Sequence, residues 1–138
     1  MVGFNLLNHS ARPSILPITQ TKQIGTLCMF AVRRALTDPK VAKELIDQLV
    51  AKGEIDLTDT NADAPLNFLT APGVASSLTE AAYRYCRHEP GIDVVLSGTG
   101  STEHLQENAR SLQQPPLPSA VLDRVNQLFA GVNSVSGN

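Results

Sequence analysis

The sequence predicts an α/β domain in which helices cover a small parallel sheet. Short apolar runs of strand length alternate along the chain with segments whose apolar residues recur at helical spacing. Such alternation is typical of parallel strands joined by helical crossovers. The run Thr26–Val32 is apolar throughout, as expected of a strand covered on both faces.

The first half of the chain reads as strand, broken helix, strand and helix. Residues 1–8 are apolar and begin without a cap, so we interpret them as a strand entered partway. A helix starting near Ser10 is expected to be interrupted by Pro13 and Pro17. After the strand at 26–32, Asp38 is a predicted helix N-cap with Pro39 at the first helical position, and Gly53 ends that helix. Its expected buried stripe is Val41, Ala42, Leu45, Ile46 and Leu49.

The second half begins with a long segment that lacks periodicity. Residues 54–75 are predicted to be a long loop with at most one short turn, and loops of this length usually form or cover a site. Ser76 or Ser77 is predicted to cap the next helix, whose apolar face is Leu78, Ala81, Ala82, Tyr85 and Cys86. A strand at 92–97, a glycine turn at 98–100 and a helix from Ser101 follow, with Leu105, Ala109 and Leu112 as that helix's buried stripe. Ser119 is predicted to cap a last helix that buries Leu122, Val125, Leu128, Phe129 and Val132.

The composition indicates one globular domain. The chain has 138 residues, of which 42% are hydrophobic and 17% charged, so it can form a core and does not resemble a disordered chain. The net charge of -2 and the lack of a long basic run make nucleic acids and anionic membranes poor candidate partners. No apolar run approaches the ~20 residues that span a bilayer, and the first residues lack the features of a signal peptide. Cys28 and Cys86 fall in apolar patterns and are expected to be reduced core residues, which suits a cytoplasmic protein.

The turn Gly98-Thr99-Gly100-Ser101 is the strongest candidate for a binding site. A strand that enters a helix through Gly-x-Gly leaves unpaired backbone N–H groups at the helix start, which favours an anion such as phosphate. It is not the dinucleotide-binding fingerprint, because Glu103 occupies the position of the third glycine. A plain strand-to-helix turn whose glycines relieve strain explains the pattern equally well, and Ser101 is equally well explained as a helix cap.

The other candidates also have a structural alternative. Arg33 and Arg34 follow the strand at 26–32 at the end where α/β folds bind ligands, so one of them could hold a phosphate, and an ion pair with a neighbouring loop is the alternative. His104, Glu107 and Asn108 are ordinary solvated helix positions unless a ligand lies against the start of that helix. The histidines and cysteines share no metal-ligand spacing, and no general acid has a recognisable setting. The residues therefore predict neither a metal site nor a catalytic residue.

Four segments together resemble the aldo-keto reductase family. Phe4–Asn8 and Ile24–Leu36 are similar to the sixth and seventh strand segments of that family. Val94–Asn108, with its Gly-x-x-x-x-x-x-Leu-x-x-Asn pattern, is similar to the eighth strand and the cofactor-binding helix, and Leu122–Phe129 to the last helix. The branch resembled is that of the sugar and galactose-type dehydrogenases. The resemblance implies a TIM (β/α)8 barrel, of which residues 1–138 correspond to about the last three strands with their helices.

The resemblance also implies a cofactor, NADP or NAD, and assigns residues to it. Gly98, Thr99, Gly100 and Ser101 fall where the family holds the adenosine phosphate, and Glu107 and Asn108 fall on the adenine-binding pair. His104 stands where many members carry an Arg for the 2′-phosphate, and Gly98 where some carry a Lys, so the choice between NADP and NAD stays open.

A second set of residues comes from the preceding strand. Met29 falls where many members stack a Tyr on the nicotinamide, and Phe30, Val32 and Arg34 fall on the loop that lies along the pyrophosphate. The implied reaction is hydride transfer between the cofactor and an aldehyde, ketone or sugar.

The resemblance does not extend to the family's catalytic residues. Its catalytic Asp, Tyr, Lys and His come from the first four strands, and a complete barrel needs ~250 residues. We therefore expect the chain to be inactive alone. The alternatives are a non-catalytic nucleotide-binding or interaction module, which pairs with an N-terminal half or with itself, and a truncated gene product. A three-stranded sheet supports an incomplete domain independently of the resemblance, because both of its edges are unpaired.

Overall fold

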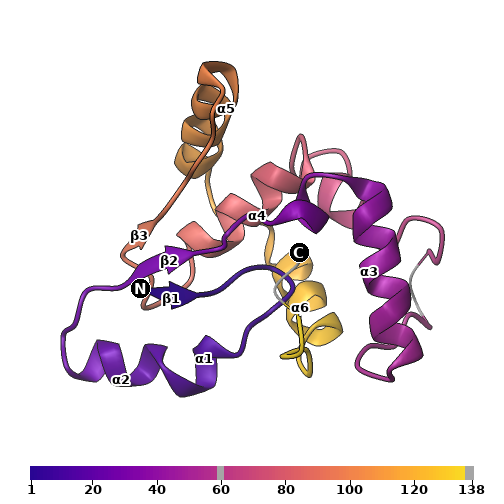
Figure 1. Ribbon diagram of the computed structural model, residues 1–138, viewed down its shortest axis with the longest axis horizontal. Helices are drawn as coiled ribbons and strands as arrows, with labels where there is room; N and C mark the ends of the chain where they lie inside the picture. The colour runs from indigo at the N-terminus through magenta and orange to yellow at the C-terminus, as the bar shows by residue number, and fades with distance from the viewer. Residues whose placement is uncertain (59–60, 136–138) are drawn as a thin grey trace.

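The protein is a mixed α/β structure built on three short parallel strands (Figure 1). The computed structural model describes residues 1–58 and 61–135. The sheet order is β1-β2-β3, and both strand pairs are parallel. The elements in chain order are β1 (Val2–Gly3), α1 (Ala11–Ser14), α2 (Leu16–Thr21), β2 (Leu27–Met29), the 3-10 helix η1 (Arg34–Leu36), α3 (Pro39–Ala51), the 3-10 helix η2 (Asn67–Thr70), α4 (Leu78–Arg87), β3 (Val94–Val95), α5 (Thr102–Gln113) and α6 (Ser119–Leu128).

The sheet has one covered and one uncovered face. Val2, Cys28 and Val95 are in register across the three strands, and Val2 and Cys28 are buried. Side chains alternate between the two faces of a strand, so the neighbouring positions lie on the opposite face. There Leu27 and Val94 are in register, and both are exposed. The apolar run at 26–32 is therefore covered on one face only.

The strands are shorter than the sequence predicts. The expected strand at 26–32 is reduced to Leu27–Met29, and the one at 92–97 to Val94–Val95. Phe30 ends β2 because its backbone turns into the left-handed region, with φ of 68°. The edges of β1 and β3 have no neighbouring strand in the described part of the chain, so the hydrogen-bond ladder cannot extend.

Most helix boundaries follow the local capping chemistry that the sequence predicts. Asp38 accepts a hydrogen bond from the backbone N–H of Lys40, and Ser77, not Ser76, caps α4 by accepting from the N–H of Glu80. The helix that follows Ser10 is broken into α1 and α2, as predicted. One cap is wrong: Ser119 is the first residue of α6, and Pro118 occupies the cap position without a side-chain hydrogen bond. The predicted loop at 54–75 contains only η2, and positions 59–60 lie outside the described residues.

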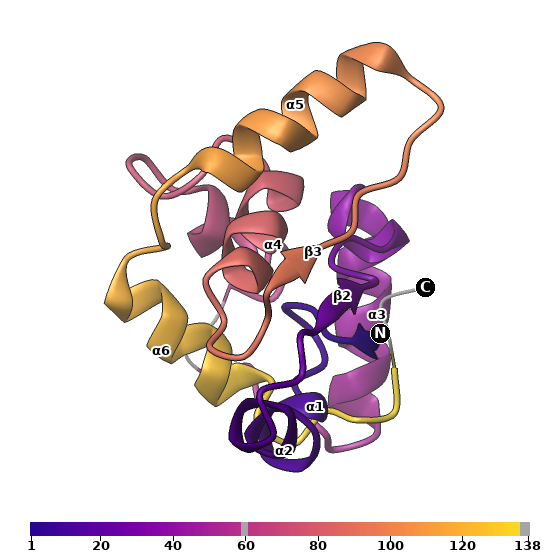
Figure 2. The same cartoon turned by 90° about the vertical axis from the view of Figure 1, so that its left-hand side faces the viewer.

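The predicted buried stripe of α5 is wrong. Leu105 is 53% exposed, Ala109 is also exposed and Leu112 is half-buried, whereas Asn108 is the buried residue of this helix. Figures 1 and 2 give the reason, because α5 rises away from the sheet and passes alongside α4. Nothing in the described residues covers the side of α5 that carries Leu105.

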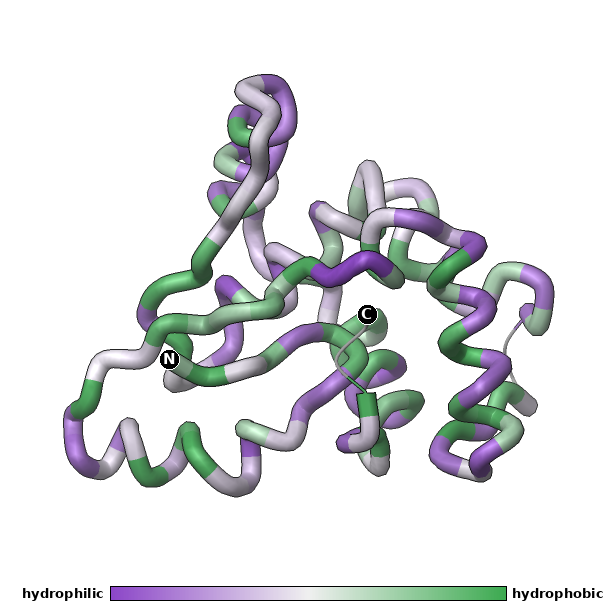
Figure 3. Tube along the Cα trace, in the orientation of Figure 1, coloured by the Kyte–Doolittle hydropathy of each residue, from purple (hydrophilic) through white to green (hydrophobic). Residues whose placement is uncertain are grey.

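The core lies between the covered sheet face and the helices α3, α4 and α6. Its largest fully buried side chains include Phe4, Leu36, Ile46, Leu49 and Phe129. Figure 3 shows apolar residues along the strands and at intervals in α3, with polar residues prevailing on α5. Cys28 and Cys86 are buried and unpaired as disulfides, as predicted. No helix among residues 1–58 and 61–135 has both the length and the apolar character to cross a bilayer.

Candidate functional site

A groove of about 1260 Å³ runs between the carboxyl ends of β2 and β3 and the flanks of α4 and α5. The parallel pairing of β2 with β3 explains its position, because the carboxyl ends of adjacent parallel strands meet at one edge of the sheet. Its lining comes from three segments. The first segment follows β2 and consists of Met29–Arg34 and Thr37. The second lies at the start of α4 and consists of Ser76, Ser77, Thr79, Glu80 and Tyr83. The third runs from the end of β3 along α5 and consists of Leu96–Thr99, His104, Glu107, Asn108, Arg110, Ser111 and Gln114.

Most residues singled out from the sequence line this one groove. Met29, Phe30, Val32 and Arg34 reach it from the first segment. Gly98, Thr99, His104, Glu107 and Asn108 reach it from the third segment. Gly100 and Ser101 are not among its lining residues. Ser101 instead caps α5 by accepting a hydrogen bond from the N–H of His104 at 3.3 Å.

The glycines of the turn leave the main chain open. A Cβ placed on Gly98 or Gly100 would meet no atom within 4 Å, and neither residue has the positive φ that favours glycine. Relief of backbone strain therefore does not explain them. Thr99 holds the turn by accepting a hydrogen bond from the N–H of Ser101 at 3.1 Å. The lack of side chains at Gly98 and Gly100 lets a ligand approach the backbone at the start of α5.

Asn108 joins α5 to the rest of the molecule. Its Nδ2 donates to Ser97 Oγ at 3.0 Å, and Ser97 Oγ also lies 3.0 Å from the Tyr83 hydroxyl. This chain of contacts links α5, the end of β3 and α4. Sequence reasoning missed Ser97 and Tyr83, since neither carries a motif. The one signal in the sequence was that Ser97 is a small polar residue at the end of the predicted strand 92–97.

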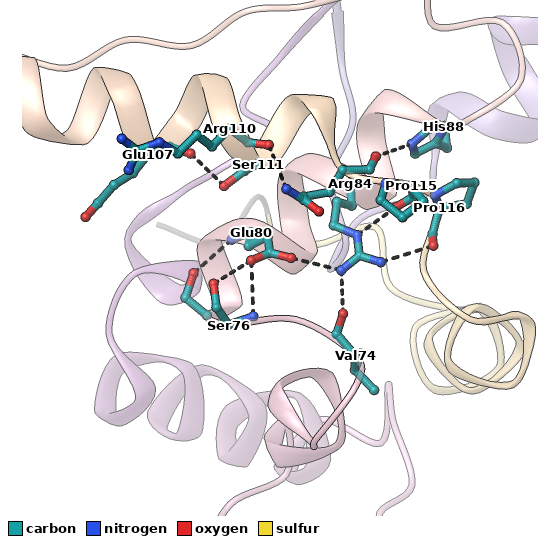
Figure 4. A network of polar contacts seen from close by, with 12 residues as sticks. Val74, Ser76, Glu80, Arg84, His88, Glu107, Arg110, Ser111, Pro115 and Pro116 are labelled. Atoms are coloured by element: carbon teal, nitrogen blue, oxygen red, sulfur yellow. Dashed lines mark hydrogen bonds and ion pairs between the residues drawn. The ribbon is translucent and has the colours of Figure 1, made fainter.

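A buried arginine, Arg84, joins α4 to the segment before it and to the segment after α5 (Figure 4). Arg84 Nε donates to the carbonyl of Pro115 at 2.8 Å, and Nη2 to that of Pro116 at 3.1 Å. Nη1 contacts Glu80 Oε1 at 2.9 Å and the carbonyl of Val74. Burial alone would raise the pKa of Glu80, but hydrogen bonds from Ser76 and Arg84 hold it below its usual range. The segments before α4 and after α5 are thereby held together.

The charges left in the groove favour an anion. The negative charge of Glu80 is neutralised by its ion pair with Arg84. The remaining charged side chains that line the groove are three arginines, Arg33, Arg34 and Arg110, and one carboxylate, Glu107. The ion pairs formed by the described residues involve other arginines and Lys43, so neither Arg33 nor Arg34 makes the ion pair considered from the sequence. Excess positive charge at a groove with open backbone N–H groups suits a phosphate or carboxylate ligand.

A second polar cluster lies between α1, α4 and α6 and is joined by several internal hydrogen bonds. Arg12 binds both oxygens of Glu89 at 2.6 Å and donates to the Tyr85 hydroxyl at 2.8 Å. Arg12 and Tyr85 also both donate to Asn126 Oδ1. His9 Nε2 lies 2.9 Å from the Leu6 carbonyl and 2.8 Å from the Tyr85 hydroxyl. These contacts join α1, α4 and α6 and stabilise their packing.

Burial decides the protonation of this cluster. Desolvation, assisted by the positive charge of Arg12, lowers the pKa of His9 from 6.5 to about 4, so the imidazole is neutral at pH 7. Desolvation also raises the pKa of Tyr85, which keeps its hydroxyl protonated. No group of three or more histidine, cysteine or acidic side chains with the geometry of a metal site occurs among residues 1–58 and 61–135.

A search against models of protein families finds no match to this chain, and a search of curated proteins finds no match either.

Proposed function

We propose that this chain carries the cofactor-binding part of an oxidoreductase site of the aldo-keto reductase type, and that it binds NADP or NAD. One observation carries the proposal. Two segments separated by more than 60 residues, which the resemblance assigns to one cofactor, line a single groove. Periodicity alone did not require the Met29–Arg34 and Gly98–Asn108 segments to meet.

The size and chemistry of the groove support a dinucleotide ligand. Pockets for drug-sized ligands measure roughly 300–1,000 Å³, and this groove exceeds that range. The open backbone at Gly98 and the dipole of α5 suit the adenosine phosphate, while Arg34 suits the pyrophosphate. Glu107 is exposed and accessible to an adenine ring. Asn108 contributes by holding α5 in place, since its amide is bound to Ser97. When bound, the nicotinamide group supplies or accepts the hydride.

The uncovered sheet face supports a partial barrel. In a barrel of parallel strands, side chains alternate between the helix layer and the interior. Leu27, Val94 and Leu96 would face that interior and be covered by the remaining strands. In this proposal the proton donor lies on those other strands, so residues 1–138 alone bind the cofactor weakly and do not turn over an aldehyde, ketone or sugar.

Titration of the ¹⁵N-labelled protein with NADPH and with NADH tests the proposal. Saturable shifts at Met29–Arg34 and Gly98–Asn108 support it. Thr99→Asp places a carboxylate in the groove and is expected to weaken binding at least about tenfold. Thr21→Asp introduces the same charge at an exposed position at the end of α2, outside the groove and away from the start of α5, and it serves as the matched control. An absence of shifts with both cofactors would refute the proposal.

An assay with NADPH and small aldehydes tests the second part. The expected rate is that of the blank. Turnover well above the blank would show that residues 1–138 contain their own proton donor.

The second candidate is a non-catalytic interaction module that docks through the sheet. The exposed Val94 and Leu96 beside the unpaired edge of β3 favour it. Light scattering after size exclusion separates the candidates. A concentration-dependent dimer without nucleotide shifts supports the module, and a monomer with nucleotide shifts supports the cofactor site.

A further inference from the structure

Phe30 and Arg33 form an unusual pair at the mouth of the groove. Phe30 is one of two non-glycine residues with positive φ among the described residues, and its side chain is 41% exposed. The Arg33 guanidinium carbon lies 4.4 Å from the centroid of the Phe30 ring. Both residues line the groove.

Contacts to both the backbone and the ring hold Phe30 in this position. Asn5 Nδ2 donates to the Phe30 carbonyl at 3.1 Å, and the N–H of Phe4 donates to the Met29 carbonyl at 3.3 Å. The ring lies against Gly3, where a Cβ would approach Phe30 Cδ2 to 3.4 Å. A left-handed phenylalanine persists only where its surroundings enforce it, and such residues concentrate at ligand sites.

Arg33 is incompletely satisfied in this arrangement. Its Nε is buried and has no hydrogen-bond partner, the only such side-chain atom among residues 1–58 and 61–135. A buried donor without a partner is costly, and each instance in a native protein calls for an explanation. Stacking on Phe30 holds the guanidinium but supplies no acceptor.

We propose that Arg33 is a switchable anion-binding residue. Without a phosphoryl ligand the Arg33 guanidinium stacks on the Phe30 ring. When a phosphoryl oxyanion enters the groove, the guanidinium leaves the ring and its N–H groups pair with the oxyanion. The Arg33 switch rests on the proposed function because its ligand enters the same groove. The switch requires a phosphoryl group in that ligand but does not require a nicotinamide. Arg33, beside Arg34, then selects for anionic ligands, and its departure from Phe30 uncovers an aromatic face at the carboxyl end of β2.

Inorganic pyrophosphate and NADPH are the probes, and the Nε–H resonance of Arg33 is the direct readout. With wild-type protein, each probe is expected to shift that resonance in a saturable manner. Arg33→Met is expected to weaken pyrophosphate binding about tenfold, as measured from backbone amide shifts at Gly98 and Thr99. Arg33→Lys keeps the charge but not the planar donors, and it should recover only part of the affinity. Arg87→Met removes the same charge from an exposed position outside the groove and should leave the affinity unchanged.

The outcomes separate this inference from the proposed function. NADPH binding that Arg33→Met does not weaken overturns the switch and leaves the cofactor site standing. Pyrophosphate binding that depends on Arg33, without any NADPH binding, supports the switch and refutes the cofactor site. An Arg33 Nε–H resonance that neither probe shifts overturns the switch. If Arg33→Met does not fold, the wild-type resonance and Arg33→Lys still decide the question.

Discussion

Acid should destabilise this protein through His9. The imidazole is 7% exposed and neutral, with its pKa lowered to about 4 from the ordinary 6.5 by desolvation and by Arg12. The unfolded chain therefore binds a proton that the folded chain does not, between these two pH values. Stability is fully present above pH 6.5 and falls as the pH drops to 4, below which both states are protonated. At 1.36 kcal/mol for each pKa unit, the loss is about 3 kcal/mol.

Urea unfolding followed by circular dichroism at pH 7 and pH 4 measures this loss. Carboxylates also titrate in acid, so the comparison that isolates the imidazole is with His9→Gln, whose amide can donate to the Leu6 carbonyl. The difference in pH dependence between wild type and His9→Gln should be about 3 kcal/mol. An NMR titration of His9 in the folded protein gives a second measure. A midpoint near 6.5, or equal pH dependence in the two proteins, would refute the reasoning.

Two further substitutions test the packing around the helices. Arg12→Met leaves the buried Glu89 carboxylate without its partner and should cost about 2–3 kcal/mol in urea unfolding, less than the ~3–5 of a fully buried pair because Arg12 is 34% exposed. Adding Glu89→Gln should recover part of that loss, and a double variant no more stable than Arg12→Met would contradict it. Asn108→Ala removes the hydrogen bond to Ser97 and should cost about 1 kcal/mol and weaken NADPH binding, because α5 forms a wall of the groove. Gln106→Ala truncates an exposed amide of the same helix outside the groove, and equal effects of the two substitutions would argue against this role.

Local chemistry predicted the helix starts well. Asp38 and Ser77 cap their helices because a short polar side chain before a helical run satisfies a free N–H without help from distant residues. The alternation of elements likewise predicted a small parallel sheet. Strand length was less predictable, because it depends on neighbouring strands and on the left-handed turn at Phe30, which no residue pattern announced.

The errors arose where burial depends on tertiary neighbours. Leu105 has the spacing of a buried stripe, but spacing does not tell whether another element covers it. The polar Asn108 is buried instead, because its amide donates to Ser97, whose hydroxyl in turn contacts Tyr83 of α4. The Arg84 contacts to three backbone carbonyls were equally invisible in the sequence, since their partners belong to separate loops.

The candidate site was predictable in its residues but not in its assembly. The glycine turn and Arg34 could be singled out from the chain, and the order β1-β2-β3 then brings them to one edge. The stacking of Arg33 on Phe30 was not predictable, because the position of Phe30 depends on Gly3 and on the hydrogen bond from Asn5.

The most direct test of the cofactor site is whether one ligand reports on both walls of the groove. In a titration of the wild-type protein with NADPH and with NADH, the account predicts that amides of Met29–Arg34 and of Gly98–Asn108 shift together with a single dissociation constant for at least one of the two. Shifts confined to one segment, or none in either segment with both cofactors, would contradict it.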